Sequence, residues 1–301
     1  MTVFTPTYNR AYILPRCYEG MLRQTCQDFI WLIIDDGSTD GTAALVREWM
    51  EDPAHPFEIR YHYQENQGMH GAHNTAYEQI DTELNTCIDS DDYMPPDAME
   101  KILRFWDTCG RDEYVAGFAG LDATEDGQVI GIRFPAERPR GRLYDYYERW
   151  GIRGDKKLVY RSDLTRHYPY PLFPGETYVG LASKYFQLDQ KYELLAYNEV
   201  LCIVEYMPDG SSRNMFRQYL RNPRGFCWFR RICMQLPFAS LRFRAKMALH
   251  YIAECRIAGE KRIVRSSPCP GLTAALLLPG WALYWYIRRQ TRNPSNENGG
   301  L

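Results

Sequence analysis

Short apolar runs alternate with helical patterns over the first 121 residues. The apolar runs predict strands at 1–5, 29–35, 57–63, 83–89 and 114–121. Apolar positions three and four residues apart predict helices at 11–24, 41–50, 71–79 and 95–106. Pro15 fits this pattern only in the first turn of its helix, where a missing N–H breaks no hydrogen bond. Strand–helix alternation at this rhythm predicts an α/β fold with a single, mostly parallel sheet flanked by helices.

The remainder of the chain changes character twice. Residues 122–212 are mixed and rich in Tyr, Arg and Pro, and we expect them to extend the sheet and to form an acceptor pocket. From 213 onward the pattern is helical and basic. We therefore predict one domain at 1–212, with halves 1–110 and 111–212, followed by a helical C-terminal extension at 213–301.

Polar segments follow the first four predicted strands. They are Pro6-Thr7-Tyr8-Asn9-Arg10, Asp35-Asp36-Gly37-Ser38, Asn66-Gln67-Gly68 and Asp89-Ser90-Asp91-Asp92. Ligands of such sheets bind outside the carboxyl ends of the strands. We therefore expect the four segments to converge on one binding edge, and this convergence carries more weight than any one of them.

The last of these segments is an acidic turn. Asp89 and Asp91 are two residues apart at a strand end, so an extended chain points both carboxylates to one side. Two hard oxygen ligands can hold Mg²⁺ or Mn²⁺ and leave positions open for phosphate oxygens. The alternative interpretation is an acidic turn that caps the following helix, a role open to Asp92.

A second acidic pair ends the second predicted strand. Asp35 and Asp36 are adjacent, and neighbouring strand residues point to opposite sides. One carboxylate can thus anchor the loop, while the other accepts hydrogen bonds from a nucleobase N–H or a ribose hydroxyl. The alternative is a solvated turn between strand and helix.

Taken in order and spacing, four motifs resemble the family 2 glycosyltransferases of the GT-A fold. The motifs are Thr5-Pro-Thr-Tyr-Asn-Arg, Ile34-Asp-Asp-Gly-Ser-Thr-Asp-Gly-Thr, Asn66-x-Gly-x-x-x-Ala-x-Asn74 and Asp89-Ser-Asp-Asp. The resemblance is strong over 1–110 and weaker through Gly225. It implies a Rossmann-like sheet and inverting transfer of a sugar from a nucleotide-diphosphate donor, a UDP-sugar, in cell-surface polysaccharide synthesis. The implied acceptor is a glycan or a lipid-linked acceptor.

The resemblance also implies roles for individual residues. Tyr8 would stack on the nucleobase in a pocket shaped by Thr5 and Pro6. Asp36, beside Asp35, would bind the base. Asp89 would contact the ribose or the metal side of the diphosphate, and Asp91 would ligate Mn²⁺ or Mg²⁺. The residues expected to line the loop near the nucleotide and sugar are Asn66, Gly68 and Asn74. Many relatives have Lys where this chain has Met69, so a phosphate or base contact is either missing or supplied by another residue, such as His70.

An inverting transfer needs a carboxylate that takes the proton of the acceptor hydroxyl. Glu176, in Phe173-Pro-Gly-Glu-Thr-Tyr-Val-Gly-Leu, is the candidate. Similar proteins carry a second Glu a few residues later, but this chain reads Val179-Gly180-Leu181. Either Glu176 acts as the base, or another acid such as Asp163 does, or catalysis is impaired. Impaired catalysis would leave a protein that binds a nucleotide sugar or glycan. A nucleotidyltransferase ranks lower, because the first loop contains only one basic residue.

The net charge of −2 hides a strong asymmetry. Residues 1–100 contain 5 Lys and Arg against 18 Asp and Glu, which gives −13, and residues 213–301 contain 16 against 3, which gives +13. The acidic part suits a metal-assisted site. The basic part suits an anionic partner, which is a phosphate-bearing acceptor, a membrane surface or a nucleic acid. The chain has no RNA-binding module signature, so we expect no nucleic-acid partner.

The apolar stretch 272–287 is interrupted by Pro279-Gly280 and followed by Arg288 and Arg289. Its 16 residues fall short of the roughly 20 that span a bilayer. We predict a membrane-surface helix at 272–292, with its Trp and Tyr side chains at the interface. The alternative for the basic region is a solvated helical face. Residues 293–301 are expected to form a polar tail.

Nine scattered cysteines without a CxxC pair predict free thiols in a reducing compartment. The N-terminus lacks a basic leader and an apolar signal region. Together these features predict a cytoplasmic protein, with the basic region at the inner face of the cell membrane.

Overall fold

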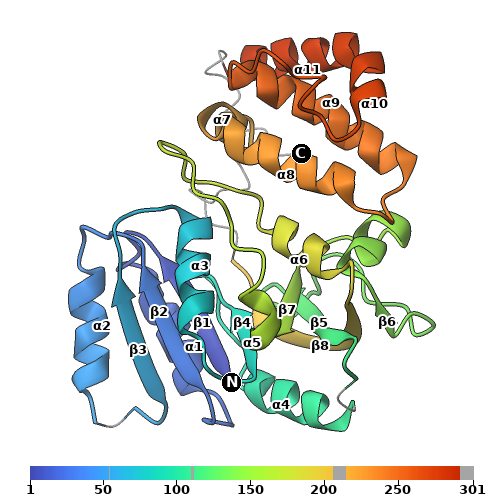
Figure 1. Cartoon of the computed structure of the whole chain (residues 1–301). Coiled ribbons are helices and arrows are strands. Elements are labelled where there is room, and N and C mark those ends of the chain that lie inside the picture. The colour runs from blue at the N-terminus through green and yellow to red at the C-terminus, as the bar shows by residue number, and fades with distance from the viewer. Residues whose placement is uncertain (54, 110–111, 206–214, 292–301) are drawn as a thin grey trace. The chain divides into compact units, whose positions relative to one another are not determined.

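The computed structural model describes residues 1–53, 55–109, 112–205 and 215–291 (Figure 1). The described residues form two compact units, each with its own interior. The first contains 1–169 and 191–205, and the second contains 170–190 and 215–291. The predicted domain boundary at 212 and the predicted tail at 293–301 lie outside the described residues.

An eight-stranded sheet forms the centre of the first unit, in the order β3-β2-β1-β4-β7-β5-β8-β6. The strands are β1 (Thr2–Thr7), β2 (Ile30–Asp35), β3 (Glu58–Tyr63), β4 (Leu84–Cys87), β5 (Val115–Ala123), β6 (Arg140–Gly141), β7 (Lys156–Arg161) and β8 (Glu193–Ile203). The first four strands are mutually parallel, and β5 pairs in parallel with β8. β7 is antiparallel to both β4 and β5. The predicted α/β fold with a mostly parallel sheet is confirmed, and the middle region extends the sheet as expected.

Helices cover both faces of this sheet. Those of the first unit are α1 (Leu14–Leu22), α2 (Thr42–Glu51), α3 (Met69–Gln79), α4 (Ala98–Thr108), the short α5 (Ser162–Thr165) and a π-helical turn, η1 (Asp145–Arg149). On one face Tyr18 of α1 stacks between Trp31 of β2 and Trp49 of α2, with ring centroids 5.8 and 4.3 Å apart. On the other face Phe4 of β1 meets Tyr77 of α3. Side chains of helices therefore pack against both faces of the sheet, as the uninterrupted apolar run of β2 requires.

The chain reverses direction across the sheet at β1. β2 and β3 are added on one side of β1, and β4 is added on the other after α3. Such a switch point leaves an opening at the carboxyl ends of the strands, where ligands of open α/β sheets bind. The fold thus brings the loops after β1, β2, β3 and β4 to one edge.

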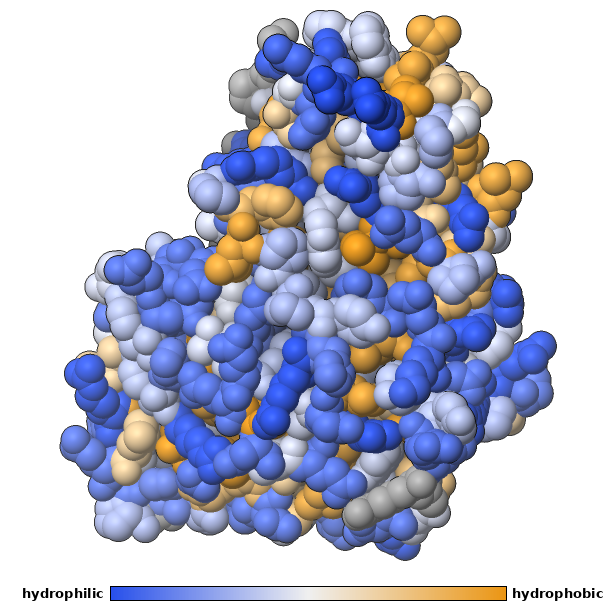
Figure 2. All heavy atoms as spheres, in the orientation of Figure 1, coloured by the Kyte–Doolittle hydropathy of each residue, from blue (hydrophilic) through white to orange (hydrophobic). Residues whose placement is uncertain are grey.

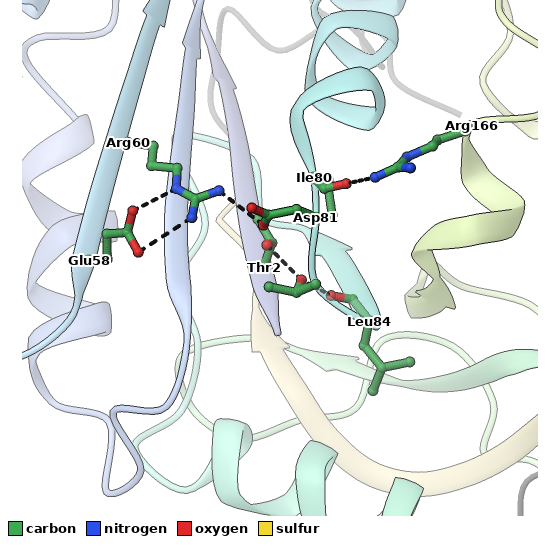
Figure 3. A network of polar contacts seen from close by, with 8 residues as sticks. Thr2, Glu58, Arg60, Ile80, Asp81, Leu84 and Arg166 are labelled. Carbon is green, nitrogen blue, oxygen red and sulfur yellow. Dashed lines mark hydrogen bonds and ion pairs between the residues drawn. The ribbon is translucent and has the colours of Figure 1, made fainter.

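Polar contacts lie at the opposite edge of the parallel strands (Figure 3). Arg60 of β3 donates to Glu58 at 2.7 Å and to Asp81 at 3.0 Å. The Thr2 and Thr82 hydroxyls are 2.8 Å apart. Hydrophilic side chains also predominate on the face of this unit that Figure 2 shows. These groups support the start of the strands and lie away from the predicted binding edge.

The predicted elements of the first half match the structure to within a few residues. α1 begins at Leu14 with Pro15 in its first turn, as expected. Asp40 accepts hydrogen bonds from the N–H and the hydroxyl of Thr42, the first residue of α2, at 3.0 and 2.6 Å. The proposed capping by Asp92 is wrong. α4 has Asp97 at its N-cap without a side-chain hydrogen bond, and Asp92 bonds elsewhere.

The second unit is helical. It contains α6 (Ala182–Leu188), α7 (Met215–Arg221), α8 (Pro223–Gln235), α9 (Leu241–Ile257), α10 (Pro270–Ala275) and α11 (Leu277–Gln290). Arg230 of α8 and Glu254 of α9 form a buried ion pair at 3.2 Å. The basic region is therefore more than a solvated face, because one of its arginines holds two helices together.

The apolar stretch 272–287 breaks one turn earlier than its sequence indicates. α10 ends at Ala275, and α11 runs through Pro279 without interruption. Pro279 lies in the first turn of α11, where its missing N–H leaves no carbonyl without a helical donor. Among the described residues, no helix has the length and apolarity needed to cross a bilayer.

Candidate functional site at the carboxyl edge of the sheet

The loops after β1 and β2 are joined by hydrogen bonds. Asn9, in the left-handed region at φ 52°, donates its N–H to the Ser38 hydroxyl at 2.8 Å. Its side-chain oxygen accepts from the Thr39 N–H at 2.8 Å. Asn tolerates this backbone conformation better than most residues, and the two bonds fix it. Tyr8 precedes this turn, and its side chain is 49% exposed at the end of β1.

Asp35 is fully buried, and both its carboxylate oxygens accept hydrogen bonds. The Ser38 N–H donates to one oxygen at 2.8 Å, and the Tyr61 hydroxyl donates to the other at 2.6 Å. Burial of the ring, together with its donation to the Asp35 carboxylate, raises the pKa of Tyr61. Asp35 is thus the member of the acidic pair that anchors the loop, and it ties β2 to β3.

Asp36 connects the end of β2 with the loop before α3. Its carboxylate accepts from the Gln64 amide at 2.7 Å and from the Gln67 N–H at 2.9 Å. Burial raises the pKa of Asp36, and these hydrogen bonds oppose the rise. Asn66 completes the connection by donating from its side chain to the Asp36 carbonyl at 2.8 Å. The sequence left open which of the two carboxylates anchors a loop, and in the structure both do.

Two glycines make this close approach sterically feasible. Gly37 has φ 87°, and a Cβ there would lie 2.9 Å from the backbone nitrogen of Asn66. Gly68 has φ 78° and is the residue that precedes α3. Both positions are in the region that disfavours side chains, so the loops after β2 and β3 depend on glycine.

The other predicted site residues near these loops are distributed between the surface and the core. Thr5 and Pro6 are buried, and the Thr5 hydroxyl accepts from the Trp31 indole at 2.9 Å. Asn74 is half-buried on α3, two turns after Gly68. His70 is buried in the first turn of α3, and Met69 is 37% exposed.

The carboxylates of the acidic turn after β4 differ in their exposure to solvent. Asp89 and Asp91 are partly exposed, whereas Asp92 is 6% exposed. Asp92 accepts from the Glu205 N–H at 3.3 Å and from the Cys202 thiol at 3.8 Å, both at the end of β8. Asp92 therefore fixes the turn to the sheet and leaves the other two carboxylates toward solvent.

Two charged residues that the sequence analysis missed contribute to the electrostatics of this turn. Lys157 of β7 donates its ammonium to the Cys87 carbonyl at 3.1 Å. Asp122 of β5 is 3% exposed, and among the described residues its Oδ1 has no hydrogen-bond partner. The adjacent Lys156-Lys157 pair at the start of an apolar run was the available signal. Its meaning depends on β7 lying between β4 and β5.

Burial and mutual repulsion raise the pKa values of the enclosed carboxyl groups. Burial is the main cause that raises the pKa of Asp92 to about 8, with Asp89, Asp91 and Asp122 adding to the rise and Lys157 opposing it. Burial likewise raises the pKa of Asp122 to about 6, against the same lysine. The repulsion that Asp89, Asp91 and Asp122 exert on Asp92 shows that acidic groups lie close together around this turn, an arrangement that favours cations.

The donor set fits a divalent cation that shares its ligands with a substrate. Asp89 and Asp91 offer partly exposed carboxylates on one turn. Among the described residues, no three His, Cys, Asp or Glu side chains are grouped as a metal site. Mg²⁺ in particular is held by one or two carboxylates together with phosphate oxygens and water. Two carboxylates on one turn therefore match this mode better than an all-protein site.

Glu176, the predicted base, lies in the second unit and is 9% exposed. Its carboxylate accepts from the backbone N–H groups of Arg224 and Gly225 at 3.1 and 2.8 Å, and from the Arg224 guanidinium at 2.9 Å. These donors belong to the first turn of α8, where backbone N–H groups lack helical partners. Glu176 therefore caps α8, and its role as the base stays a prediction. Asp163, the other candidate, is 61% exposed and paired with Arg161 at 2.7 Å.

The comparison with family models decides the assignment of the chain. The model described as "Glycosyl transferase family 2" matches residues 2–164, more than half of the chain. The chain belongs to glycosyl transferase family 2. The matched part contains every loop of the carboxyl edge described above.

Curated relatives of this family 2 chain include synthases of surface polymers. The chain is 37% identical to chondroitin synthase of Escherichia coli over 103 residues, which are 34% of this chain and 15% of the relative. It is 33% identical to the teichoic acid poly(glycerol phosphate) polymerase of Staphylococcus epidermidis over 93 residues, 31% of this chain and 13% of that protein. The chain thus spans only a small part of the length of these relatives.

Solved structures resemble almost the whole chain. S. aureus TarS 1-349 in complex with UDP has a TM-score of 0.55 at 14% identity, and covers 97% of this chain and 90% of its own. The mannosyltransferase PcManGT of Pyrobaculum calidifontis, in complex with GDP-Man and Mn²⁺, has a TM-score of 0.57 at 20% identity, with coverage of 98% and 84%. The predicted GT-A fold is confirmed.

Proposed function

We propose that the chain is an inverting, metal-dependent glycosyltransferase that uses a UDP-sugar and a glycan or lipid-linked acceptor in cell-surface polysaccharide synthesis. One observation carries the proposal. Hydrogen bonds link the loops after β1, β2 and β3, and the acidic turn after β4 lies at the same edge of the sheet. Relatives described as polymer synthases and fold neighbours in complex with UDP or GDP-Man support the same substrate class.

In this proposal the nucleotide occupies the carboxyl edge. Tyr8 stacks on the base with its exposed ring, and Asp36 recognises the base while holding the loop that contains Asn66 and Gly68. Thr5, Pro6 and Asp35 form the buried floor, because their side chains face the interior of the unit. Asn74 lies on the helix that follows, toward the sugar.

Asp89 and Asp91 would hold Mn²⁺ or Mg²⁺ at the diphosphate. The cation, when bound, neutralises charge that develops on the leaving group. Asp92 contributes indirectly, because its bonds to the end of β8 set the conformation of the turn. The positive charge of Lys157 partly offsets the mutual repulsion of the carboxylates, and so opposes the rise of the Asp92 pKa.

The base assigned in the proposal is Glu176. A second candidate function, a nucleotide-sugar-binding protein with little turnover, is favoured by two observations. Leu181 lies in the stretch where similar proteins have a second acid, and the Glu176 carboxylate already accepts three hydrogen bonds. Both functions share the donor site and differ only in turnover.

Thermal denaturation with UDP and Mn²⁺ tests the donor site. A ligand at about 100 times its Kd stabilises the folded state by about 2.7 kcal/mol, so the midpoint temperature should rise by several degrees. Asp91→Ala should lose the Mn²⁺-dependent part of the rise. Asp81→Asn is the matched control, because that exposed carboxylate pairs with Arg60 at the opposite edge of the sheet.

Hydrolysis of nucleotide sugars by the same variants separates the two candidate functions. The enzyme should release UDP from its donor in a Mn²⁺-dependent reaction that Asp91→Ala abolishes. Donor-dependent stabilisation without release, whatever acceptor is offered, would favour the binding protein. A wild type that no nucleotide stabilises, with or without metal, would refute both.

A further inference from the structure

A cationic cavity lies in the second unit, beside the end of α9 and the first half of α11. It has a volume of about 680 Å³, and four of its lining residues are Arg256, Lys261, Arg262 and Arg265. Glu260 is the one carboxylate of the lining, which leaves a formal charge of +3. In the part of the chain that the structure describes, none of the four cations forms an ion pair. Unneutralised basic side chains around a cavity of this size favour an anionic group.

An apolar stripe on α11 adjoins this cavity. Leu278, Trp281 and Trp285 are 82%, 45% and 61% exposed. Their spacing of three and four residues puts them on one side of the helix. Trp281 belongs to both features, since it lines the cavity and packs under the Arg256 guanidinium, 4.7 Å from the ring centroid. The stripe and the cationic cavity therefore form one continuous surface.

The packing of α11 keeps this stripe exposed. Gly280 lies so close to α9 that a Cβ there would come within 2.5 Å of Ile252, and Ile287 is fully buried. The helix is thus fixed by its other side, and rotation to bury the tryptophans would pull Gly280 away from α9. In Figure 2 orange side chains lie next to dark blue ones over the region where Figure 1 labels α10 and α11.

We propose that this surface, defined by Arg256, Lys261, Arg262, Arg265, Leu278, Trp281 and Trp285, docks on an anionic phospholipid membrane and binds a lipid phosphate in the cavity. The charge is complementary to phosphate head groups. A site for a soluble anion does not need exposed apolar side chains. On a membrane, Leu278 would enter the acyl boundary, and the amphipathic Trp rings would stay at the interface. Arginines match phosphate oxygens in geometry as well as in charge.

The dimensions of α11 fit a helix that lies in the plane of the interface. Its 14 residues extend roughly 21 Å at 1.5 Å per residue, less than the roughly 30 Å hydrocarbon core of a bilayer. Arg288 and Arg289 at its C-terminal end add charge at the head-group level. The helix therefore rests on the membrane and does not enter it end-on.

Vesicle binding by the full chain tests the proposal. Sedimentation with vesicles of 30% phosphatidylglycerol in phosphatidylcholine should recover the protein, and pure phosphatidylcholine should not. Binding should weaken at least tenfold when salt is raised from about 0.05 to 0.5 M, because exposed charges are screened. Tryptophan fluorescence should shift to shorter wavelength on binding.

Two sets of variants separate the apolar and the cationic contributions. Trp281→Ser with Trp285→Ser should lower vesicle affinity at least tenfold, and so should Arg262→Gln with Arg265→Gln. Leu278→Ser is the mildest variant, since its side chain is almost fully exposed. Leu241→Ser with Arg242→Gln is the matched control, because these exposed residues begin α9, roughly 20 Å along the helix from Arg256. The control should bind like the wild type.

Three results would overturn the proposal. One is equal binding to neutral and anionic vesicles, and another is equal loss of affinity in the control variant. The third is absence of vesicle binding together with self-association that Leu278→Ser abolishes, which would assign the stripe to a second copy of the chain. Soluble glycerol phosphate should not compete at millimolar concentration, which distinguishes a lipid surface from a free phosphate ligand.

Discussion

The carboxylate of Asp36 accepts a 2.9 Å hydrogen bond from the backbone N–H of Gln67, and so joins the end of β2 to the loop before α3. Asp36→Ala leaves this N–H and the Gln64 amide without their acceptor, which should cost about 1–3 kcal/mol of unfolding free energy. Affinity for UDP should fall at least tenfold, measured by calorimetry. Asp81→Ala should leave that affinity unchanged, and a similar loss there would contradict the assignment.

Asp92 should give the stability of the metal-free protein a specific pH dependence. Its pKa is raised to about 8, whereas the unfolded chain loses this proton near pH 4. The contribution of this group to unfolding free energy therefore falls as pH rises from about 4 to about 8.

Asp92→Asn carries no charge at any pH. Relative to wild type it should gain on the order of a few kcal/mol between pH 5 and pH 8, as measured by urea denaturation with a metal chelator present. A difference that stays constant over this range would contradict a protonated Asp92. Because Asp92 is not among the assigned ligands, the variant should keep Mn²⁺-dependent stabilisation by UDP.

Glu176 has two assigned roles that different substitutions separate. Glu176→Gln retains an acceptor oxygen for the first turn of α8 but cannot take a proton. If Glu176 is the base, this substitution should lower kcat at least 100-fold with little change in the KM for the donor. Formate should partly restore turnover in Glu176→Ala by taking the place of the lost carboxylate. A kcat within tenfold of wild type, with a lower midpoint temperature, would leave only the capping role.

The buried pair of Arg230 and Glu254 should be sensitive to loss of one partner. Arg230→Met leaves the fully buried Glu254 carboxylate without its guanidinium partner. The free energy of unfolding should fall by about 3–5 kcal/mol. The double variant Arg230→Met, Glu254→Leu should recover most of this stability. Arg231→Met, at the exposed neighbouring position, is the control. A double variant as unstable as the single one would show that the loss has another origin.

Lys184 is nearly fully buried in α6, and burial lowers its pKa to about 7. The unfolded chain keeps this proton up to about pH 10.5, so the contribution of Lys184 to unfolding free energy rises between pH 7 and pH 10.5. Lys184→Met should therefore raise the midpoint temperature at pH 7, with a benefit that disappears above pH 10. Lys246→Met, at an exposed position of α9, should show no such trend.

The first half of the fold could be predicted because its signals are local. The apolar run before Asp35 identifies β2 without knowledge of any partner, and parallel strands connected by helices bring their carboxyl ends together. The loops named from the sequence accordingly meet at one edge. Their internal bonds, such as the one from Tyr61 to Asp35, could not be predicted, because they depend on side-chain directions across neighbouring strands.

The rest of the site could not be predicted, because it depends on strands that are far apart in the sequence and pair in the sheet. Lys157 contacts a carbonyl 70 residues earlier in the sequence, and only because β7 inserts between β4 and β5. Arg230 is a different case, since it lies three or four positions from Phe226, Cys227, Cys233 and Met234, all of which are buried. That helical spacing was present in the sequence. An arginine on the apolar face of a helix therefore predicts a buried acidic partner.

The cap that Glu176 provides has a consequence for dissecting the protein. The carboxylate and its N–H donors are 48 and 49 residues apart, in the segments 170–190 and 215–291. A chain truncated before α8 would retain this charge and lose all three donors. The C-terminal helices are therefore not a detachable appendage: a fragment that ends at 205 should misfold around residues 170–190, whatever the integrity of its sheet.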